Sequence, residues 1–473
     1  MDICFMTARD IASAIKQKKV SAREVMEAHL DQIKQMNPYV NAIVSPVEDQ
    51  AVQAAIAADE QLAAGIDVGP LHGLPMAHKD THATAGIPTT YGSPVFRDHI
   101  PEQNDLIIER LKGAGAITVG KTNVPEFAAG AHTYNSVFGT TKNPYDLTKT
   151  AGGSSGGAAV AVACGMTPLA DGSDMGGSCR FPAAFNNVVG LRTSPGRVPS
   201  YPKKAPLSPL AVQGPLARNV ADAAFMMSVI AGPDTRSPIS IEEPGTQFRE
   251  TLDRDLTGLR VAWSTDLGGA FPVDPAVREN IEQQVKIFED LGCIVEEACP
   301  DLADADHVFH VLRAWEMAMS YSELLDQHRE LFKSDLIWNI EKGQQLSRRD
   351  IDQAIQHHQQ LYHNMRAFFE RYDVLLLPVS QVPPFDANLD YPKTITGESM
   401  ENYIDWMRSC YYISATGHPA LSVPSGLTSD GLPLGLQIVG RHRADFEVLQ
   451  IGHAFEKATG YGKQRPPLLT TFN

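Results

Sequence analysis

Two serine clusters, each enclosed by glycines, lie close together between Lys149 and Pro182. Residues 152–157 read GGSSGG, and residues 176–178 read GGS. Glycine permits positive φ and the close approach of another group, because it has no Cβ. A serine among glycines is therefore accessible, and nearby backbone N–H groups can point at whatever reaches it. These are the properties of a nucleophile beside an oxyanion hole.

A flexible linker is the alternative interpretation of a stretch rich in glycine and serine. An apolar helix is expected over residues 157–164, between the two clusters. Linkers do not enclose such a helix, so the pattern favours a folded site.

The length and composition indicate a large globular protein. The chain has 473 residues, of which 43% are hydrophobic and 20% are charged. That length fits one large α/β domain or two or three smaller ones. No linker in the sequence is long enough to divide domains. We therefore expect a single domain over residues 1–473.

Helical patterns alternate with short apolar segments along the chain. A capping box at Ser21 and Glu24 opens a helix that Asn37 and Pro38 are expected to stop. Helices are expected over residues 21–36, 48–64, 104–112, 157–164, 219–230, 275–291, 301–332, 347–372, 403–415 and 445–459. Strands are expected over residues 74–80, 116–119, 187–191, 259–263, 293–297, 374–378, 421–424 and 434–439. This alternation predicts an α/β fold in which a central sheet is flanked by helices on both faces.

Charge and cysteine content limit the partners and the compartment. The net charge is −16, which argues against nucleic acid or an anionic membrane as the main partner. No signal peptide is visible at the N-terminus, and no run of 18 apolar residues could span a membrane. The six cysteines are scattered without a CxxC motif. We expect reduced thiols and a cytoplasmic protein.

Lys79 is the first candidate catalytic residue outside the serine clusters. It follows the apolar residues 74–77 at the end of an expected strand. A lysine at a strand end commonly reaches solvent. Burial would instead lower its pKa and leave a neutral amine that can accept a proton. Because a serine nucleophile needs a base and no histidine motif supplies one, the serine clusters favour the base role for Lys79.

Two well-known motifs occur and are rejected. Residues 115–122 fit the P-loop formula, but the intervening Ala-Ile-Thr-Val is typical of a strand rather than of a phosphate loop. Residues 153–157 fit the G-x-S-x-G elbow with Ser155 as nucleophile. That motif needs a strand immediately before it, and residues 146–150 do not have a strand pattern.

The spacing of the histidines is only weak evidence for a metal site. His78 and His82 are four residues apart, and His307 and His310 are three apart. The chain has neither HxH nor HExxH, so coincidental spacing is the better interpretation. We expect no metal and no cofactor.

Longer motifs resemble the amidase signature family. Lys79, residues 152–157 and residues 172–184 (GSDMGGSCRFPAA) match the family in type and spacing. Flanking segments also match it, at residues 120–123, 143–144, 190–193 and 433–440. The resemblance covers nearly the whole chain and implies the amidase signature fold, in which the central β-sheet is mixed.

The resemblance implies a cofactor-free hydrolase with a Ser–cis-Ser–Lys triad. Ser178 would be the nucleophile, Ser154 the bridging serine on a cis peptide, and Lys79 the neutral general base. The backbone N–H groups of Met175, Gly176, Gly177 and Ser178 would form the oxyanion hole.

Other positions are assigned supporting roles by the same resemblance. Ala128 matches a position whose backbone lies against the site, and Ser155 would be a supporting hydrogen-bonding residue. Asp174 and Arg180 are expected to form a structural ion pair rather than to bind substrate.

The sequence departs from the family at several positions near the site. The family usually has proline at Ala151, threonine at Ser173 and Met175, and isoleucine or valine at Cys179. Ser414 stands where asparagine is common. None of these differences removes a catalytic group. For Cys179 we prefer the role of a small buried hydrophobic residue over that of a reactive thiol.

The resemblance predicts a serine amidohydrolase that acts on a small molecule. An amide, an ester or a carbamate would be cleaved through an acyl-enzyme on Ser178, with an aryl amide as the candidate substrate. The alternative is the amidase (A) subunit of a tRNA-dependent amidotransferase, which releases ammonia for a partner. A binding protein without catalysis is disfavoured, because all three triad positions are filled.

The signature core is placed at about residues 70–200 and the variable, substrate-pocket half at about residues 300–420. Aromatic residues of the C-terminal half are candidates for lining the substrate pocket, namely Trp315, Tyr321, Trp338, Trp406, Tyr411 and Tyr412. Core packing explains them equally well. The sequence leaves the oligomeric state open, with a homodimer as one option.

Overall fold

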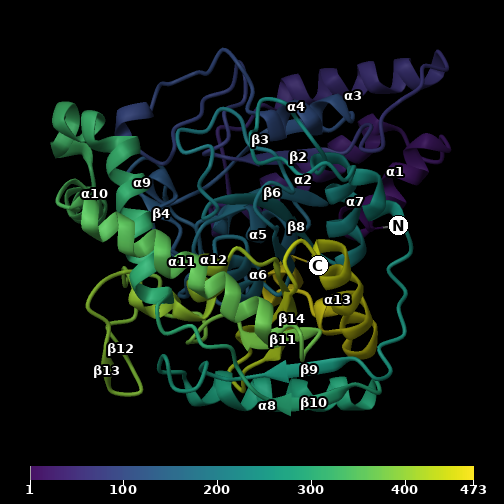
Figure 1. The fold of residues 1–473 in the computed structure, drawn as a ribbon. Coiled ribbons are helices and arrows are strands. Elements are labelled where there is room, and N and C mark those ends of the chain that lie inside the picture. Colours follow the sequence, from purple (N-terminus) through teal and green to yellow (C-terminus); the bar gives the residue numbers. More distant parts are fainter. Residues whose placement is uncertain (1, 473) are drawn as a thin grey trace.

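One mixed β-sheet runs through the centre of the computed structural model, which describes residues 2–472 (Figure 1). Within those residues the sheet has eleven strands. In spatial order they are β1 (Ile43–Val44), β3 (Ile117–Thr122), β2 (Pro75–Lys79), β6 (Leu169–Asp174), β8 (Val212–Ala217), β7 (Val189–Arg192), β14 (Ala420–Leu427), β15 (Pro433–Gly440), β11 (Val374–Pro378), β9 (Arg260–Trp263) and β10 (Ile294–Glu297). The pairs β4 (Tyr134–Asn135) with β5 (Gly139–Thr140) and β12 (Thr394–Ile395) with β13 (Glu398–Ser399) form two small hairpins.

Helices cover the sheet and fill the two ends of the molecule. They are α1 (Ala8–Lys16), α2 (Ala22–Val40), α3 (Glu48–Ala63), α4 (Leu106–Gly113), α5 (Gly156–Ala163), α6 (Arg180–Phe185), α7 (Val220–Ile230), α8 (Pro275–Asp290), α9 (Ala305–His328), α10 (Ser334–Gln344), α11 (Arg348–Phe368), α12 (Arg408–Thr416) and α13 (Asp445–Thr459). Figure 1 shows α1 to α4 near the β3 end of the sheet and α8 near β9 and β10 at the other end.

The sheet separates two hydrophobic cores. Successive side chains of a strand point to opposite faces. In β11, Leu376 belongs to the core that includes α2, α7 and α13, whereas Leu375 and Leu377 belong to the core that includes α9, α11 and α12. Helices therefore flank both faces of one mixed sheet, as the sequence predicts.

The predicted helix over residues 21–36 extends further than expected. The capping box at Ser21 is present, but α2 runs through Pro38 to Val40. Asn41 ends it in the left-handed conformation, and the Asn37 side chain accepts hydrogen bonds from the N–H groups of Ala42 and Ile43. The prediction that Asn37 and Pro38 stop the helix is therefore wrong, since α2 continues for two residues beyond Pro38. The missing N–H of Pro38 costs the last turn one hydrogen bond without ending the helix.

Several elements near the site lacked a clear signal in the sequence. The expected helix over residues 301–332 ends at His328, and α10 forms as a separate helix. Strands β6 and β8 and helix α6 were not predicted. The sequence of β6, LADGSD, does not alternate, because the strand lies in the sheet interior and is almost wholly buried.

Candidate active site

The candidate site lies where β2, β6 and the N-terminus of α5 meet. Lys79 is the last residue of β2, which pairs in parallel with β6. Ser173 lies near the end of β6, and Ser154 and Ser155 immediately precede α5. The carboxyl ends of adjacent parallel strands are a common position for active sites in α/β folds.

The Lys79 amine is surrounded by serine hydroxyls. Its Nζ atom lies 2.8 Å from Ser154 Oγ, 2.8 Å from Ser155 Oγ and 2.9 Å from Ser173 Oγ. The side chain is fully buried. Burial lowers the pKa of Lys79 from 10.5 to about 8, although the nearby Cys179, Asp174 and Asp171 oppose that shift.

Three hydroxyl partners suit either protonation state of this lysine. An ammonium donates three hydrogen bonds, whereas a neutral amine donates two and accepts one. Loss of a proton from Lys79 therefore needs only the rotation of one serine hydroxyl, with no buried polar group left unpaired. The arrangement allows Lys79 to exchange a proton with Ser154 without moving heavy atoms.

Close packing around the first serine cluster requires glycine. The peptide between Gly153 and Ser154 is cis, as the resemblance implies. A Cβ at Gly157 would lie 2.3 Å from the backbone nitrogen of Asn123 and 2.6 Å from the carbonyl oxygen of Ala42. Helix α5 can approach these segments only because this position lacks a side chain.

Ser178 lines a cavity of about 290 Å³ together with Ser154 and Ser173. Its carbonyl oxygen accepts a hydrogen bond from the N–H of Ser155 at 3.2 Å. Its Oγ has no hydrogen-bond partner among residues 2–472. The hydroxyl is therefore available to a molecule in the cavity.

The predicted oxyanion segment is only partly free to bind an anion. The N–H of Gly177, at φ +120°, donates to Asp174 Oδ1 at 2.9 Å. The N–H groups of Met175, Gly176 and Ser178 donate no hydrogen bond within the described part of the chain. The N–H of Gly177 therefore helps to hold the loop. The N–H groups of Met175, Gly176 and Ser178 lie beside the cavity without a partner among the described residues.

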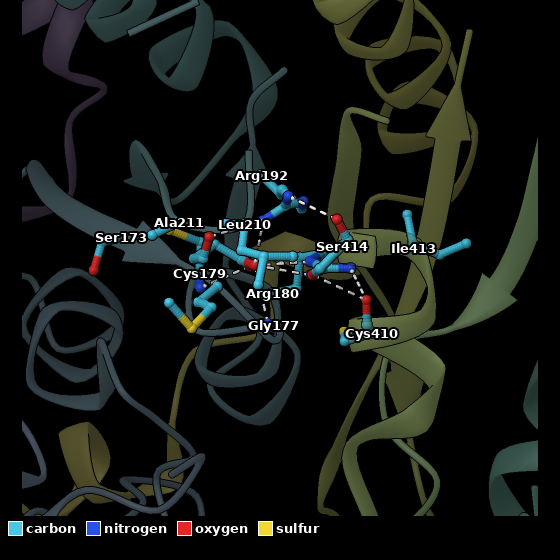
Figure 2. A network of polar contacts seen from close by, with 12 residues as sticks. Ser173, Gly177, Cys179, Arg180, Arg192, Leu210, Ala211, Cys410, Ile413 and Ser414 are labelled. Carbon is cyan, nitrogen blue, oxygen red and sulfur yellow. Dashed lines mark hydrogen bonds and ion pairs between the residues drawn. The ribbon is translucent and has the colours of Figure 1, made fainter. Parts of the chain in front are cut away.

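Asp174 is the centre of a buried network that braces this loop, and Figure 2 shows its partners Arg180 and Arg192. It accepts hydrogen bonds from Arg180 Nη2 at 2.8 Å and from Arg192 Nη1 at 3.3 Å, and all three side chains are fully buried. Burial raises the pKa of Asp174, but the two guanidinium groups outweigh it and hold the pKa well below its usual range. The expected structural pairing of Asp174 with Arg180 is present.

Ser414 completes the network from α12. Its Oγ accepts a hydrogen bond from Arg180 Nη2 at 2.7 Å, and its carbonyl oxygen accepts one from Arg192 Nη2 at 3.2 Å. Figure 2 shows Ser414 and Cys410 on one side of the network, with Arg180 and Arg192 pointing toward them. Serine therefore fits the place where the family commonly has asparagine.

A second buried carboxylate, Asp171 on β6, was not identified from the sequence. It accepts hydrogen bonds from His78 Nδ1 at 2.7 Å, His82 Nδ1 at 2.6 Å and the backbone N–H of Lys79 at 3.0 Å. Burial raises the pKa of Asp171, but the two histidines lower it well below its usual value. Because a carboxylate only accepts, each histidine carries its proton on Nδ1.

The four-residue spacing of His78 and His82 therefore has a structural cause, which is their shared contact with Asp171. Burial also lowers the pKa of His78, so this ring is neutral. Among the described residues, no group of three His, Cys, Asp or Glu side chains is arranged to hold a metal ion. The sequence carried no clear signal for this contact, because the strand that holds Asp171, LADGSD, was itself not predicted.

The remaining site predictions divide between the cavity and its surroundings. Ala128, at φ +57°, and the predicted oxyanion residues Met175 and Gly176 line the cavity. Ser155 is fully buried, which contradicts its alternative interpretation as an exposed nucleophile. The P-loop interpretation is also excluded, because Ile117–Thr122 forms strand β3.

Of the two interpretations left open for the aromatic residues, core packing holds for most of them and pocket lining for one. Tyr321 lines the cavity. Trp406 packs against Phe181 with ring centroids 5.1 Å apart, and Tyr411 stacks on Phe309 at 4.4 Å. These large rings are buried in the core that includes α9 and α11, where they contribute a large apolar area. Trp315, Trp338 and Tyr412 do not line this cavity within residues 2–472 either.

Cys179 is a buried thiol of low reactivity. It is fully buried, and burial together with the charge of Asp174 raises its pKa. The thiolate is the reactive form, so this environment suppresses nucleophilic chemistry. All six cysteines are unpaired. In the described part of the chain, no helix is both long and apolar enough to cross a membrane.

The fold is that of a class of hydrolases that act on amide bonds. The profile of the Amidase family matches residues 24–449, and the chain belongs to this amidase signature family. The sequence is 36% identical to an acylamidase of Rhodococcus erythropolis, over 98% of this chain and 97% of that protein. It is 33% identical to the A subunit of the glutamyl-tRNA(Gln) amidotransferase of Alkaliphilus metalliredigens, over 98% and 99%.

A solved structure shares the whole fold. A bacterial aryl acylamidase of the amidase signature family superposes with a TM-score of 0.91 and 31% identity, over 97% of each chain. The amidase signature fold that the sequence motifs imply is therefore confirmed.

Proposed function

We propose that this protein is a serine amidase whose nucleophile is Ser178. The observation that carries the proposal is the contact between Lys79 Nζ and Ser154 Oγ, 2.8 Å apart at the wall of a cavity that Ser178 also lines. In the proposed reaction, Ser178 Oγ attacks the amide carbonyl carbon while its proton passes to Ser154. Ser154 passes its own proton to neutral Lys79.

The leaving amine takes up a proton by the same route in reverse. The C–N bond breaks as Lys79 returns a proton through Ser154 to the amine nitrogen, which leaves an acyl-enzyme on Ser178. Water then attacks the ester, and the same relay accepts and returns its proton. The products are a carboxylic acid and an amine, with all atoms and charges balanced.

The three unengaged N–H groups of Met175, Gly176 and Ser178 would stabilise the oxyanion. Each donor of this kind contributes a few kcal/mol to transition-state binding, roughly 3–4 kcal/mol where it has been removed by mutation. Gly177 would act by shaping the loop, since its N–H already donates to Asp174. No cofactor is needed for this chemistry.

The substrate class is inferred from the relatives and from the cavity. A volume of about 290 Å³ is suited to a small acyl or aryl group. The relatives named acylamidase and aryl acylamidase support an aryl amide as the first substrate to test. We further propose that residues of about 300–420 form the variable part of the pocket, because Arg313, Met317 and Tyr321 line it.

The A subunit of a tRNA-dependent amidotransferase is the second candidate, supported by the 33% identical relative. That protein would release ammonia for a partner. Residues 172–181, GSDMGGSCRF, favour the self-contained amidase, because the Asp-Met and Cys-Arg-Phe sequences look less like those of the amidotransferase.

The test is turnover by the isolated chain. We would measure release of aniline from acetanilide and butyranilide by the purified protein, beside an ester, a carbamate and glutamine. Hydrolysis of the anilides without a partner supports the amidase. Ammonia release from glutamine, restricted to mixtures that contain the other amidotransferase components, would instead support the second candidate.

A further inference from the structure

One wall of the cavity is basic although the protein as a whole is acidic. Arg313 on α9 and Lys203 and Lys204 on the segment between β7 and β8 all line the cavity. The whole chain carries a net charge of −16. A concentration of cations at the site therefore opposes the overall charge of the molecule.

Arg313 is buried without an ionic partner. Its exposed fraction is 4%, and within residues 2–472 it forms no ion pair. Nη1 contacts the sulfur of Met175 at 3.1 Å, Nη2 donates to the Tyr403 hydroxyl at 3.0 Å, and Nε has no hydrogen-bond partner. A thioether is a weak acceptor. A buried guanidinium with such partners leaves donors available for a strong acceptor.

The two lysines also lack carboxylate partners in the described structure. Lys203 Nζ donates to the carbonyl oxygens of Ser208 and Ala211, and Lys204 Nζ donates to the carbonyl oxygen of Ser320. Carbonyl groups satisfy hydrogen bonds but do not neutralise charge. Lys203 is partly buried, whereas Lys204 is exposed at the edge of the cavity.

Two acidic residues, Glu316 and Asp105, line the same cavity as the cations. Glu316 lies one turn from Arg313, accepts a hydrogen bond from Ser208, and has a pKa raised by burial. Asp105 accepts a hydrogen bond from the backbone N–H of Ala83, and burial raises the pKa of Asp105 as well. On the wall formed by α9 and residues 203–204, one glutamate therefore faces three cations.

The basic wall adjoins the segment where the reacting carbonyl would lie. Arg313 touches the side chain of Met175, whose N–H belongs to the oxyanion segment. The ring of Phe309, one turn before Arg313, lies close to Gly176, because a Cβ added at Gly176 would be 3.0 Å from that ring. Phe309 therefore limits the space beside Gly176. An anionic group a few bonds from the scissile amide would reach Arg313.

We propose that the wall formed by Arg313, Lys203 and Lys204 binds a carboxylate of the substrate. The substrates would then be amides that carry a carboxylate on the acyl or the amine portion. The inference rests on the proposed amidase function. It adds a preference for substrates that carry a carboxylate.

The test uses matched pairs of anilides. Glutaric acid monoanilide and pentananilide differ by an acyl-side carboxylate, and 4-butyramidobenzoate and butyranilide differ by an amine-side carboxylate. We expect the wild type to favour the charged member of one pair by about tenfold or more in kcat/KM, the size of a charge-assisted hydrogen bond. The pair that shows the preference identifies which portion contacts the wall.

Arg313→Met should reduce this charged-to-neutral ratio by about tenfold, and Lys204→Gln should reduce it by a smaller factor because that side chain is exposed.

Arg348→Met is the matched control. Arg348 lies on α11 with a side chain 93% exposed and does not line the cavity. It changes the net charge equally and should retain the wild-type ratio. A preference for the neutral member in both pairs would overturn the proposal, as would an unchanged ratio in folded Arg313→Met.

A binding measurement separates this proposal from the catalytic one. In Ser178→Ala protein, calorimetric titration with glutaric acid monoanilide and 4-butyramidobenzoate reports affinity without turnover. Tighter binding of a charged compound than of its neutral partner, lost in Ser178→Ala/Arg313→Met, supports the basic wall even if Ser178 is not the nucleophile. Equal binding of charged and neutral compounds would overturn it even if hydrolysis is observed.

Discussion

The backbone N–H of Lys79 donates to Asp171 Oδ2 at 3.0 Å, so a buried carboxylate holds the end of the strand that carries the candidate base. The same carboxylate accepts from His78 and His82. Asp171 also opposes the lowering of the Lys79 pKa through its charge. It is therefore a positioning residue, whose effect reaches the substrate through Lys79.

Replacing this carboxylate should move the pH profile. In Asp171→Asn the negative charge that stabilises protonated Lys79 is absent, so the pKa of Lys79 falls further and the acidic limb of kcat/KM shifts to lower pH. The variant should also be less stable by about 1–3 kcal/mol, because asparagine offers one acceptor oxygen in place of two and leaves a buried N–H donor unsatisfied. The measurements are the pH dependence of anilide hydrolysis and urea unfolding.

Asp445→Asn provides the control for destabilisation. Asp445 is buried and pairs with Arg197 at 3.1 Å, but it does not line the cavity. This variant should lose stability and keep the wild-type pH midpoint. Equal midpoints in Asp171→Asn and the wild type would rule out an electrostatic effect of Asp171 on Lys79.

The wild-type activity should increase as Lys79 loses its proton. With a pKa of about 8, kcat/KM should rise about tenfold per pH unit below pH 8 and become constant above it. The sign follows from the role of the amine, since only the neutral form accepts a proton. Circular dichroism over the same range checks that the fold persists. An optimum in acid with an intact fold would contradict the neutral-lysine role.

Removing the nucleophile should abolish turnover. Ser178→Ala should reduce kcat for anilides by at least about 10³-fold, because covalent catalysis is lost while the fold is retained. Ser155→Ala is the matched substitution, and it should reduce activity less, because Ser154 and Ser173 still contact Lys79. If Ser178→Ala retained wild-type activity, the nucleophile would have to be sought elsewhere.

The conformation of the oxyanion loop should depend on glycine at position 177. Gly177 has φ +120°, and a Cβ there would lie 2.5 Å from the Phe181 ring and 2.7 Å from Cys410 Cβ. Gly177→Ala should cost more than about 3 kcal/mol of stability, because positive φ and overlap with buried side chains act together. Thermal unfolding and anilide hydrolysis measure the effect.

Gly269→Ala is the control that tests the cost of positive φ without crowding of the added Cβ. Gly269 has φ +86°, and a Cβ there would have no atom within 4 Å. Its cost should be about 1 kcal/mol, with activity retained. A similar loss in both variants would show that crowding at Gly177 is unimportant.

Much of the fold was accessible from local sequence patterns. The final helix, Asp445–Thr459, and the strand Val374–Pro378 match their predicted bounds, because periodicity and flanking breakers mark both. Strand β6 was missed for the opposite reason. Its residues, LADGSD, take their conformation from pairing with β2 and β8 rather than from their own propensities.

The sequence by itself determined the family and the α/β architecture, because long motifs retain type and spacing along the chain. It also predicted a site built on Lys79, Ser154 and Ser178. Only the tertiary structure decided which buried groups surround them. Asp171 meets Lys79, His78 and His82 across neighbouring strands, and Arg313 reaches Met175 from α9. Such contacts join residues far apart in the chain, and they depend on burial, which sets both the pKa of Lys79 and the need for a partner at Arg313.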